Sequence, residues 1–102
     1  MTKQVQINGK GYPVSFGFAA LMTFTDQTGL SLNELDKLGD NMALSDALAM
    51  MWAGLKDGAR KEKQAFSLTI EDVADMLDDD QEALGKVLEV FADSFGEKQP
   101  GK

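Results

Sequence analysis

The stretch INGKGYPVSFGFAALMTFTDQTG, residues 7–29, decides the fold because its hydrophobic period changes within it. Apolar residues alternate from Val5 to Phe16 on both sides of Asn8 and Gly9. Asn-Gly is strongly preferred in a type I′ turn, where both residues take positive φ, so we predict a two-stranded β-hairpin. An isolated hairpin is marginally stable, and one of its faces must therefore pack on another element.

That other element is predicted to be helical, because the apolar spacing after Phe16 changes to a period of about 3.6 residues. The apolar face of this helix comprises Phe18, Leu21, Met22 and Thr25. Gly29 follows as a residue suited to the left-handed conformation that ends many helices.

Two further helices are predicted in the middle of the chain. The first is short: Ser31 and Glu34 have capping-box spacing, and leucines continue to Leu38. The second is the longest element and starts near Asn41 or Ser45. Its core stripe comprises Leu44, Ala47, Leu48, Met51, Trp52 and Leu55.

Thr69 and Asp72 are predicted to cap a fourth helix, and a fifth follows three aspartates and carries apolar residues to Phe95. The fold class is therefore α+β: an N-terminal β-hairpin followed by about five α-helices in a mostly helical single domain, residues 1–95. Residues 96–102 contain two glycines, a proline and no apolar anchor, which predicts a flexible C-terminal tail.

Composition excludes several classes of protein. The chain has 102 residues, 43% of them hydrophobic, which suffices for one modest core. Its net charge of -7 opposes the phosphate backbone of nucleic acids, so nucleic-acid binding is not expected. The N-terminus lacks an apolar signal region, and no segment approaches the roughly 20 apolar residues of a membrane span. We expect a soluble, unexported protein with no membrane contact.

Catalytic groups are scarce because the chain contains neither histidine nor cysteine. These residues supply the usual general base near neutral pH, the thiolate nucleophile and the commonest zinc ligands. No serine has a G-x-S-x-G setting, and no glycine cluster matches a P-loop or a dinucleotide-binding motif. We predict no enzymatic activity and no cofactor.

Two charged clusters have the composition of a binding site. The carboxylates that fit a calcium-loop register are Asp78, Asp80, Glu82 and Glu89. The register fails because its glycine position is Ala83, and the aspartates at 78–80 are predicted instead to cap the last helix. The cations that could form a basic patch are Lys56, Arg60, Lys61 and Lys63. They lie at a helix C-terminus, where cations are favoured, and a solvated structural role is the stronger prediction.

A few apolar side chains lie about 120° or more away from the predicted buried helix faces. These are Phe24, Met42, Met50 and Val90. Two interpretations remain open: either the small domain buries two sides of its helices, or these residues form an exposed apolar patch ringed by acids. The six methionines suit an adaptable surface of that kind. We predict these four residues as partner-binding. Self-association of the chain is a further expectation, without assigned residues.

The order of these elements resembles the tail assembly chaperones of long-tailed bacteriophages and related prophages. The resemblance covers roughly residues 5–95. It is carried by the hairpin, by FGF at residues 16–18, by Trp52 with the following AGL, and by a T-x-E-[DE]-V helix start at Thr69. The matching residues are mostly structural, and no catalytic residue is carried over.

The resemblance implies a non-enzymatic role in phage tail assembly. Such a chaperone coats the long, helical, aggregation-prone tape measure protein, helps to recruit tail tube protein, and leaves before the tail is complete. It would act in the bacterial host cytoplasm and be absent from the mature virion. Many members also have a longer form made by ribosomal frameshifting, and the codons of Gly101 and Lys102 would show whether slippage can occur here.

Other function classes remain open from the residues alone. An acidic adaptor, or a DNA mimic acting against host defence, is supported by the net charge of -7, although the carboxylates are scattered among caps and helix faces. A salt-sensitive complex with a DNA-binding enzyme would favour the mimic. An enzyme subunit would be favoured by measurable turnover or a metal-dependent shift in melting temperature.

Overall fold

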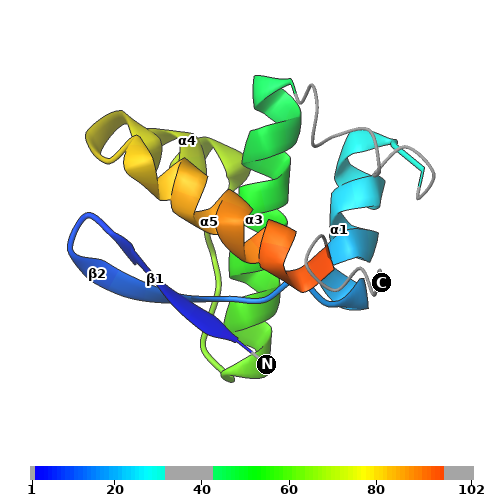
Figure 1. The fold of residues 1–102 in the computed structure, drawn as a ribbon, viewed down its shortest axis with the longest axis horizontal. Helices are drawn as coiled ribbons and strands as arrows, with labels where there is room; N and C mark the ends of the chain where they lie inside the picture. The colour runs from blue at the N-terminus through cyan, green and yellow to red at the C-terminus, as the bar shows by residue number, and fades with distance from the viewer. Residues whose placement is uncertain (1, 32–42, 96–102) are drawn as a thin grey trace.

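The computed structural model describes residues 2–31 and 43–95. The elements in chain order are β1 (Lys3–Ile7), β2 (Lys10–Val14), α1 (Phe18–Thr28), α3 (Leu44–Lys61), α4 (Ile70–Asp79) and α5 (Glu82–Phe95) (Figure 1). The predicted α+β class, with a small N-terminal hairpin on a mostly helical chain, is confirmed. The described ranges contain four helices, not about five. The short helix predicted to run to Leu38 falls at residues outside those ranges.

The hairpin forms as its sequence predicts. β1 and β2 pair antiparallel, with Val5 opposite Tyr12 and Ile7 opposite Lys10. Asn8 has φ 55° and Gly9 has φ 81°, so both turn residues take the positive φ that a type I′ turn requires. Figure 1 shows α4 and α5 on the same side of the hairpin. Strand β1 packs against α5 and strand β2 packs against α3, which gives the apolar residues of the hairpin a core to enter.

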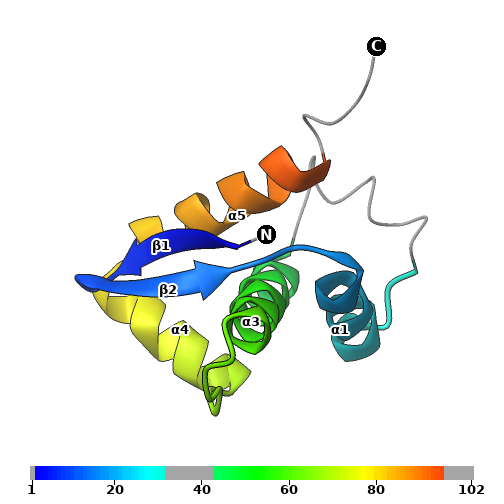
Figure 2. The ribbon, with the colours of Figure 1, turned by 90° about the horizontal axis from the view of Figure 1, so that it is seen from below.

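Helix α3 is the centre of the fold and packs against α1, β2, α4 and α5 (Figures 1 and 2). Two glycines let its backbone approach the hairpin closely. A Cβ on Gly58 would lie 2.2 Å from the Pro13 carbonyl oxygen, and one on Gly54 would meet the Phe16 ring. The Ser15 amide donates a hydrogen bond of 3.1 Å to the Gly54 carbonyl. Contact at this distance requires residues without a Cβ, so the glycines fix the end of β2 on α3.

Helix α1 faces the core with a different side from the one predicted. Its buried residues are Ala20, Leu21 and Phe24, whereas Phe18 and Met22 are exposed. The prediction that Phe18 and Met22 belong to the packed face is therefore wrong. Apolar residues occur on several sides of α1, and the side with Ala20 allows close packing against the antiparallel α3 (Figure 1).

The capping box that begins α4 is confirmed. Thr69 Oγ1 accepts from the Asp72 amide at 3.1 Å, and Asp72 Oδ2 accepts from the Thr69 amide at 2.9 Å. The prediction that the aspartate side chains at 78–80 cap the last helix is wrong. Asp79 still belongs to α4, and Asp80 Oδ2 accepts a hydrogen bond of 3.0 Å from the Asn8 amide instead. This bond ties the α4 end to the hairpin turn.

Candidate functional site

The residues predicted to form a partner-binding patch do not form one on the described surface. Phe24 and Met50 have no exposed area and belong to the core, and Val90 is half-buried against it. The predicted exposure of Phe24 and Met50 is therefore wrong, because α1 and α3 bury both residues in a core that surrounds α3. Met42 lies outside the described residues. The alternative interpretation, in which a small domain buries two sides of a helix, is correct for α3, where both Met50 and Met51 are buried.

Three large apolar side chains are exposed within residues 2–31 and 43–95. Phe18 is 83% exposed, and Met22 and Leu44 are each 67% exposed. The prediction that Leu44 belongs to the core stripe of α3 is therefore wrong, because Leu44 is the first residue of the helix and lies outside the core. Phe18 and Met22 are four residues apart on α1, so they lie on one side of that helix about one turn apart. We call this pair the α1 ridge. Both residues are visible in the sequence as apolar, but only the packing of α1 shows that they point outward.

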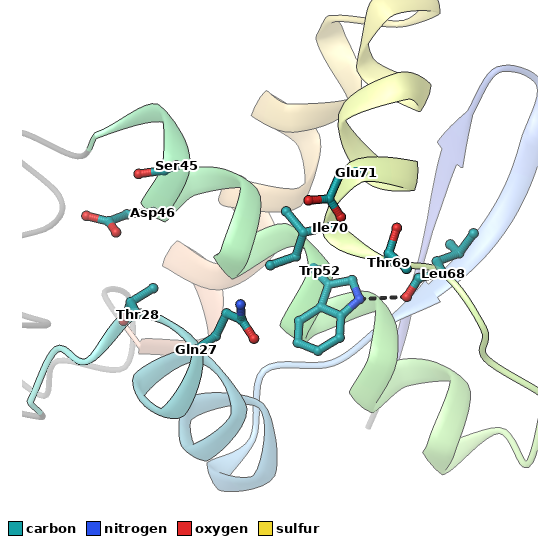
Figure 3. A pocket seen from close by; sticks show the side chains of 9 residues that line it. All are labelled: Gln27, Thr28, Ser45, Asp46, Trp52, Leu68, Thr69, Ile70 and Glu71. Carbon is teal, nitrogen blue, oxygen red and sulfur yellow. Dashed lines mark hydrogen bonds between the residues drawn. The ribbon is translucent and has the colours of Figure 1, made fainter.

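A cleft of about 630 Å³ opens where the end of α1 meets the starts of α3 and α4 (Figure 3). It is lined by Gln27, Thr28, Ser45, Asp46, Trp52 and residues 68–71. Trp52 is half-buried in it, and its Nε1 donates a hydrogen bond of 2.8 Å to the Leu68 carbonyl oxygen (Figure 3). We call this feature the Trp52 cleft. The apolar spacing of α3 predicts Trp52 in the core stripe, and nothing in the sequence indicates the cleft.

The Trp52 cleft has acidic groups at its edge. Asp46 and Glu71 lie in the first turns of α3 and α4, where carboxylates favourably meet the helix dipoles. Neither carboxylate has a hydrogen bond or an ion pair within the part of the chain that the structure describes. The nearby cation is Lys56, whose Nζ lies 5.0 Å from the centroid of the Trp52 ring. The cleft therefore combines an apolar floor with unpaired negative charge.

A second charged cluster lies where β2 meets α3, and it is structural. Asp57 is 3% exposed, and its Oδ1 accepts hydrogen bonds from Arg60 Nη2 at 2.6 Å and Arg60 Nε at 3.0 Å. Lys61 Nζ lies 3.6 Å from Asp57 Oδ2 and donates to Ser15 Oγ at 2.9 Å. This arrangement confirms a structural role for Arg60 and Lys61, and it joins α3 to the segment that leads into α1.

The environment of Asp57 keeps its carboxyl group ionised. Burial alone raises the pKa of this group, but hydrogen bonding by Arg60 and Ser15 and the positive charges of Lys61 and Arg60 outweigh it. The net pKa lies below the ordinary value of 3.8. The cluster therefore stabilises the fold through paired charges, although the buried Asp57 Oδ2 accepts no hydrogen bond and has only the Lys61 ammonium group 3.6 Å away.

Within the described ranges, no group of three or more acidic side chains, histidines or cysteines is placed to hold a metal ion. The helices of the same ranges include none that is long and apolar enough to cross a bilayer. No protein-family model, curated protein or solved structure matches the chain. The candidate functional features are therefore two surfaces suited to binding: the α1 ridge and the Trp52 cleft.

Proposed function

We propose that this protein is a non-enzymatic tail assembly chaperone that binds the tape measure protein of a long-tailed phage or prophage and helps to recruit tail tube protein. The observation that carries the proposal is the exposure of the α1 ridge. Phe18 belongs to the FGF motif on which the resemblance rests, and it is 83% exposed, whereas Phe16 of the same motif is buried. Phe16 packs edge-on against Phe91, with ring centroids 5.4 Å apart. The motif therefore supplies one aromatic ring to the core and one to the surface.

The energy available at the α1 ridge suits a contact repeated along an extended partner. Full burial of one large apolar side chain contributes roughly 1.5–3 kcal/mol, so covering both ridge residues would contribute roughly 3 kcal/mol. A single contact of this size is too weak for a stable complex, because association itself costs at least about 4 kcal/mol. Many copies bound side by side on a long apolar partner would shield it if neighbouring copies also contact each other, because unlinked copies gain no avidity. Contacts that are weak one by one would still let the copies leave when the tail assembles.

The charge of the chain supports the same role. A net charge of -7 makes each bound copy add negative charge to the complex, and like-charged complexes repel each other and resist aggregation. The proposed site of action is the bacterial host cytoplasm, before the tail is complete, so the mature virion would not contain the chaperone.

Co-expression of the full chain with a tape measure protein from a phage or prophage that encodes this chain tests this proposal. Soluble yield and light scattering of the eluted complex are measured for the wild type and for the double variant Phe18→Ser, Met22→Ser. Leu44→Ser is the matched control, because Leu44 is as exposed as Met22 but lies on α3. Far-UV circular dichroism confirms that each variant folds.

We expect a soluble complex with several copies of the wild type or of Leu44→Ser. We expect at least about a tenfold lower yield with the double variant, because removing roughly 3 kcal/mol per copy lowers each affinity by about a hundredfold. If the tape measure protein aggregates equally with and without the wild-type chain, the proposed function is wrong. The acidic adaptor and DNA-mimic alternatives would then take its place.

A further inference from the structure

The Trp52 cleft is distinct from the α1 ridge and has a different chemistry. The indole N–H of Trp52 is bonded to the Leu68 carbonyl, and Lys56, which is not part of the cleft lining, places its Nζ 5.0 Å from the ring centroid. A ligand in the cleft would therefore contact the part of the ring that Lys56 leaves open. Ile70 lies beside the ring in the same cleft (Figure 3). The floor therefore offers apolar contacts.

The carboxylates at the edge of the cleft favour a positively charged ligand. Asp46 and Glu71 approach from two different helices, and both carboxylates are unpaired among the described residues. An anionic occupant would be repelled by these groups and by the net charge of -7. A cationic occupant would gain charge-assisted hydrogen bonds at the edge and apolar contact on the floor.

The form of the cleft favours a segment of a protein over a small molecule. Small-molecule sites enclose most of the ligand and direct a few polar groups inward. Here the walls come from the ends of three separate helices, and the polar side chains Gln27, Ser45 and Glu71 are exposed at the edge. An amphipathic segment can lie across such an open cleft with one apolar side chain inserted.

From these observations we infer that the Trp52 cleft binds a positively charged amphipathic segment of the partner protein. An apolar side chain of that segment packs on Trp52 and Ile70, and separate lysine or arginine side chains pair with Asp46 and with Glu71, which lie apart along the cleft edge (Figure 3). The inference rests on the proposed function, in that the tape measure protein would supply the segment. The cleft then provides the charge selectivity that the purely apolar α1 ridge lacks.

The chain contains a single tryptophan, so the fluorescence of Trp52 reports on the cleft without labelling. Two synthetic helical peptides serve as probes: they share one apolar stripe, and their polar positions carry lysine in one peptide and glutamate in the other. Each is titrated into the full chain while emission wavelength and acrylamide quenching of Trp52 are recorded. We expect a blue shift and weaker quenching with the lysine peptide only, with an affinity that falls as salt rises.

Variants locate the charge contact. Asp46→Asn with Glu71→Gln should weaken binding of the lysine peptide about three- to tenfold. The control Glu82→Gln with Glu89→Gln changes the net charge equally at exposed positions of α5, which contributes no residue to the cleft lining, and it should bind like the wild type. Neutral amides preserve side-chain shape, and melting curves confirm that both variants fold.

Equal responses to the two peptides, or equal losses in the two double variants, would overturn the inference. An unchanged Trp52 signal with the lysine peptide would overturn it as well. This assay needs no tape measure protein, so its failure is distinguishable from failure of the proposed function. If co-expression yields a soluble complex while the peptides leave Trp52 unchanged, the chaperone role stands and the cleft is not its contact.

Discussion

Replacing Gly58 with alanine should destabilise the fold by about 2 kcal/mol, although alanine is the better helix former by about 1 kcal/mol. The new Cβ would lie 2.2 Å from the Pro13 carbonyl oxygen, 2.4 Å from the Pro13 carbonyl carbon and 2.7 Å from the Val14 amide nitrogen. All three are backbone atoms of β2, so no side-chain rotation can relieve the contact. The strand or the helix must move by about 1 Å to restore an ordinary separation of roughly 3.5 Å.

The magnitude follows from three terms. Overpacking of this kind costs about 1–3 kcal/mol. Moving β2 away from α3 also weakens the Ser15 to Gly54 hydrogen bond, which contributes about 1 kcal/mol. The gain of about 1 kcal/mol in helix propensity offsets part of the sum and leaves about 2 kcal/mol. For a chain of this size the melting temperature should fall by about 8 °C, since each kcal/mol shifts it by about 4 °C.

Thermal unfolding followed by circular dichroism at the helical band measures this shift, and Gly85→Ala is the control. Gly85 lies in α5, and a Cβ there would meet no atom within 4 Å. That variant should therefore gain about 0.5–1 kcal/mol and melt a few degrees higher. If Gly58→Ala melts at or above the wild-type temperature while Gly85→Ala behaves as expected, β2 does not pack on α3 as described here.

Two further predictions concern polar contacts of α3. Asp57→Asn should lower stability at pH 7 by about 2 kcal/mol, less than the roughly 3–5 kcal/mol of a fully buried pair, because the Arg60 side chain is 61% exposed. Because the pKa of Asp57 is depressed below 3.8, its contribution is fully present above that pH and is lost as pH falls through the folded-state pKa. Urea unfolding at several pH values should therefore show that the difference in free energy of unfolding between wild type and variant shrinks below pH 3.8. A difference that persists at lower pH would contradict a stabilising role for the ionised Asp57 carboxylate. Trp52→Phe should lower stability by about 1–2 kcal/mol through loss of the hydrogen bond to the Leu68 carbonyl, and an unchanged urea midpoint would argue against that bond.

The hairpin and the start of α4 could be predicted from short stretches of sequence alone. Asn8 and Gly9 specify their turn through backbone conformation alone, and Thr69 with Asp72 closes a capping box within one helical turn. Features of this kind depend on neighbours in the chain, which the sequence displays directly. The α3 helix was predictable for a related reason, since its apolar residues continue over many turns.

Which side of each helix is buried depends on contacts between distant residues. Apolar side chains surround α1, so the choice between Phe18 and Phe24 as the core residue is made by the closeness of α3. The role of Gly58 also depends on a distant residue. The sequence shows a glycine within a helix, and only the fold shows that the Pro13 backbone lies too close to leave room for a Cβ. The Trp52 cleft forms where the end of α1 meets the starts of α3 and α4, and their meeting cannot be predicted from any one segment of the sequence.

Site-directed photocross-linking tests the central claim, which is that the α1 ridge contacts the tape measure protein. The chain has no cysteine, so Met22→Cys provides a unique thiol for a benzophenone maleimide. Glu89→Cys, at an exposed position of α5, carries the same label as a control. Irradiation of the co-expressed complex should cross-link the tape measure protein to the label at position 22 and not to the label at position 89. Equal cross-linking from both positions, or cross-linking from position 89 alone, would contradict the assignment of the α1 ridge as the partner contact.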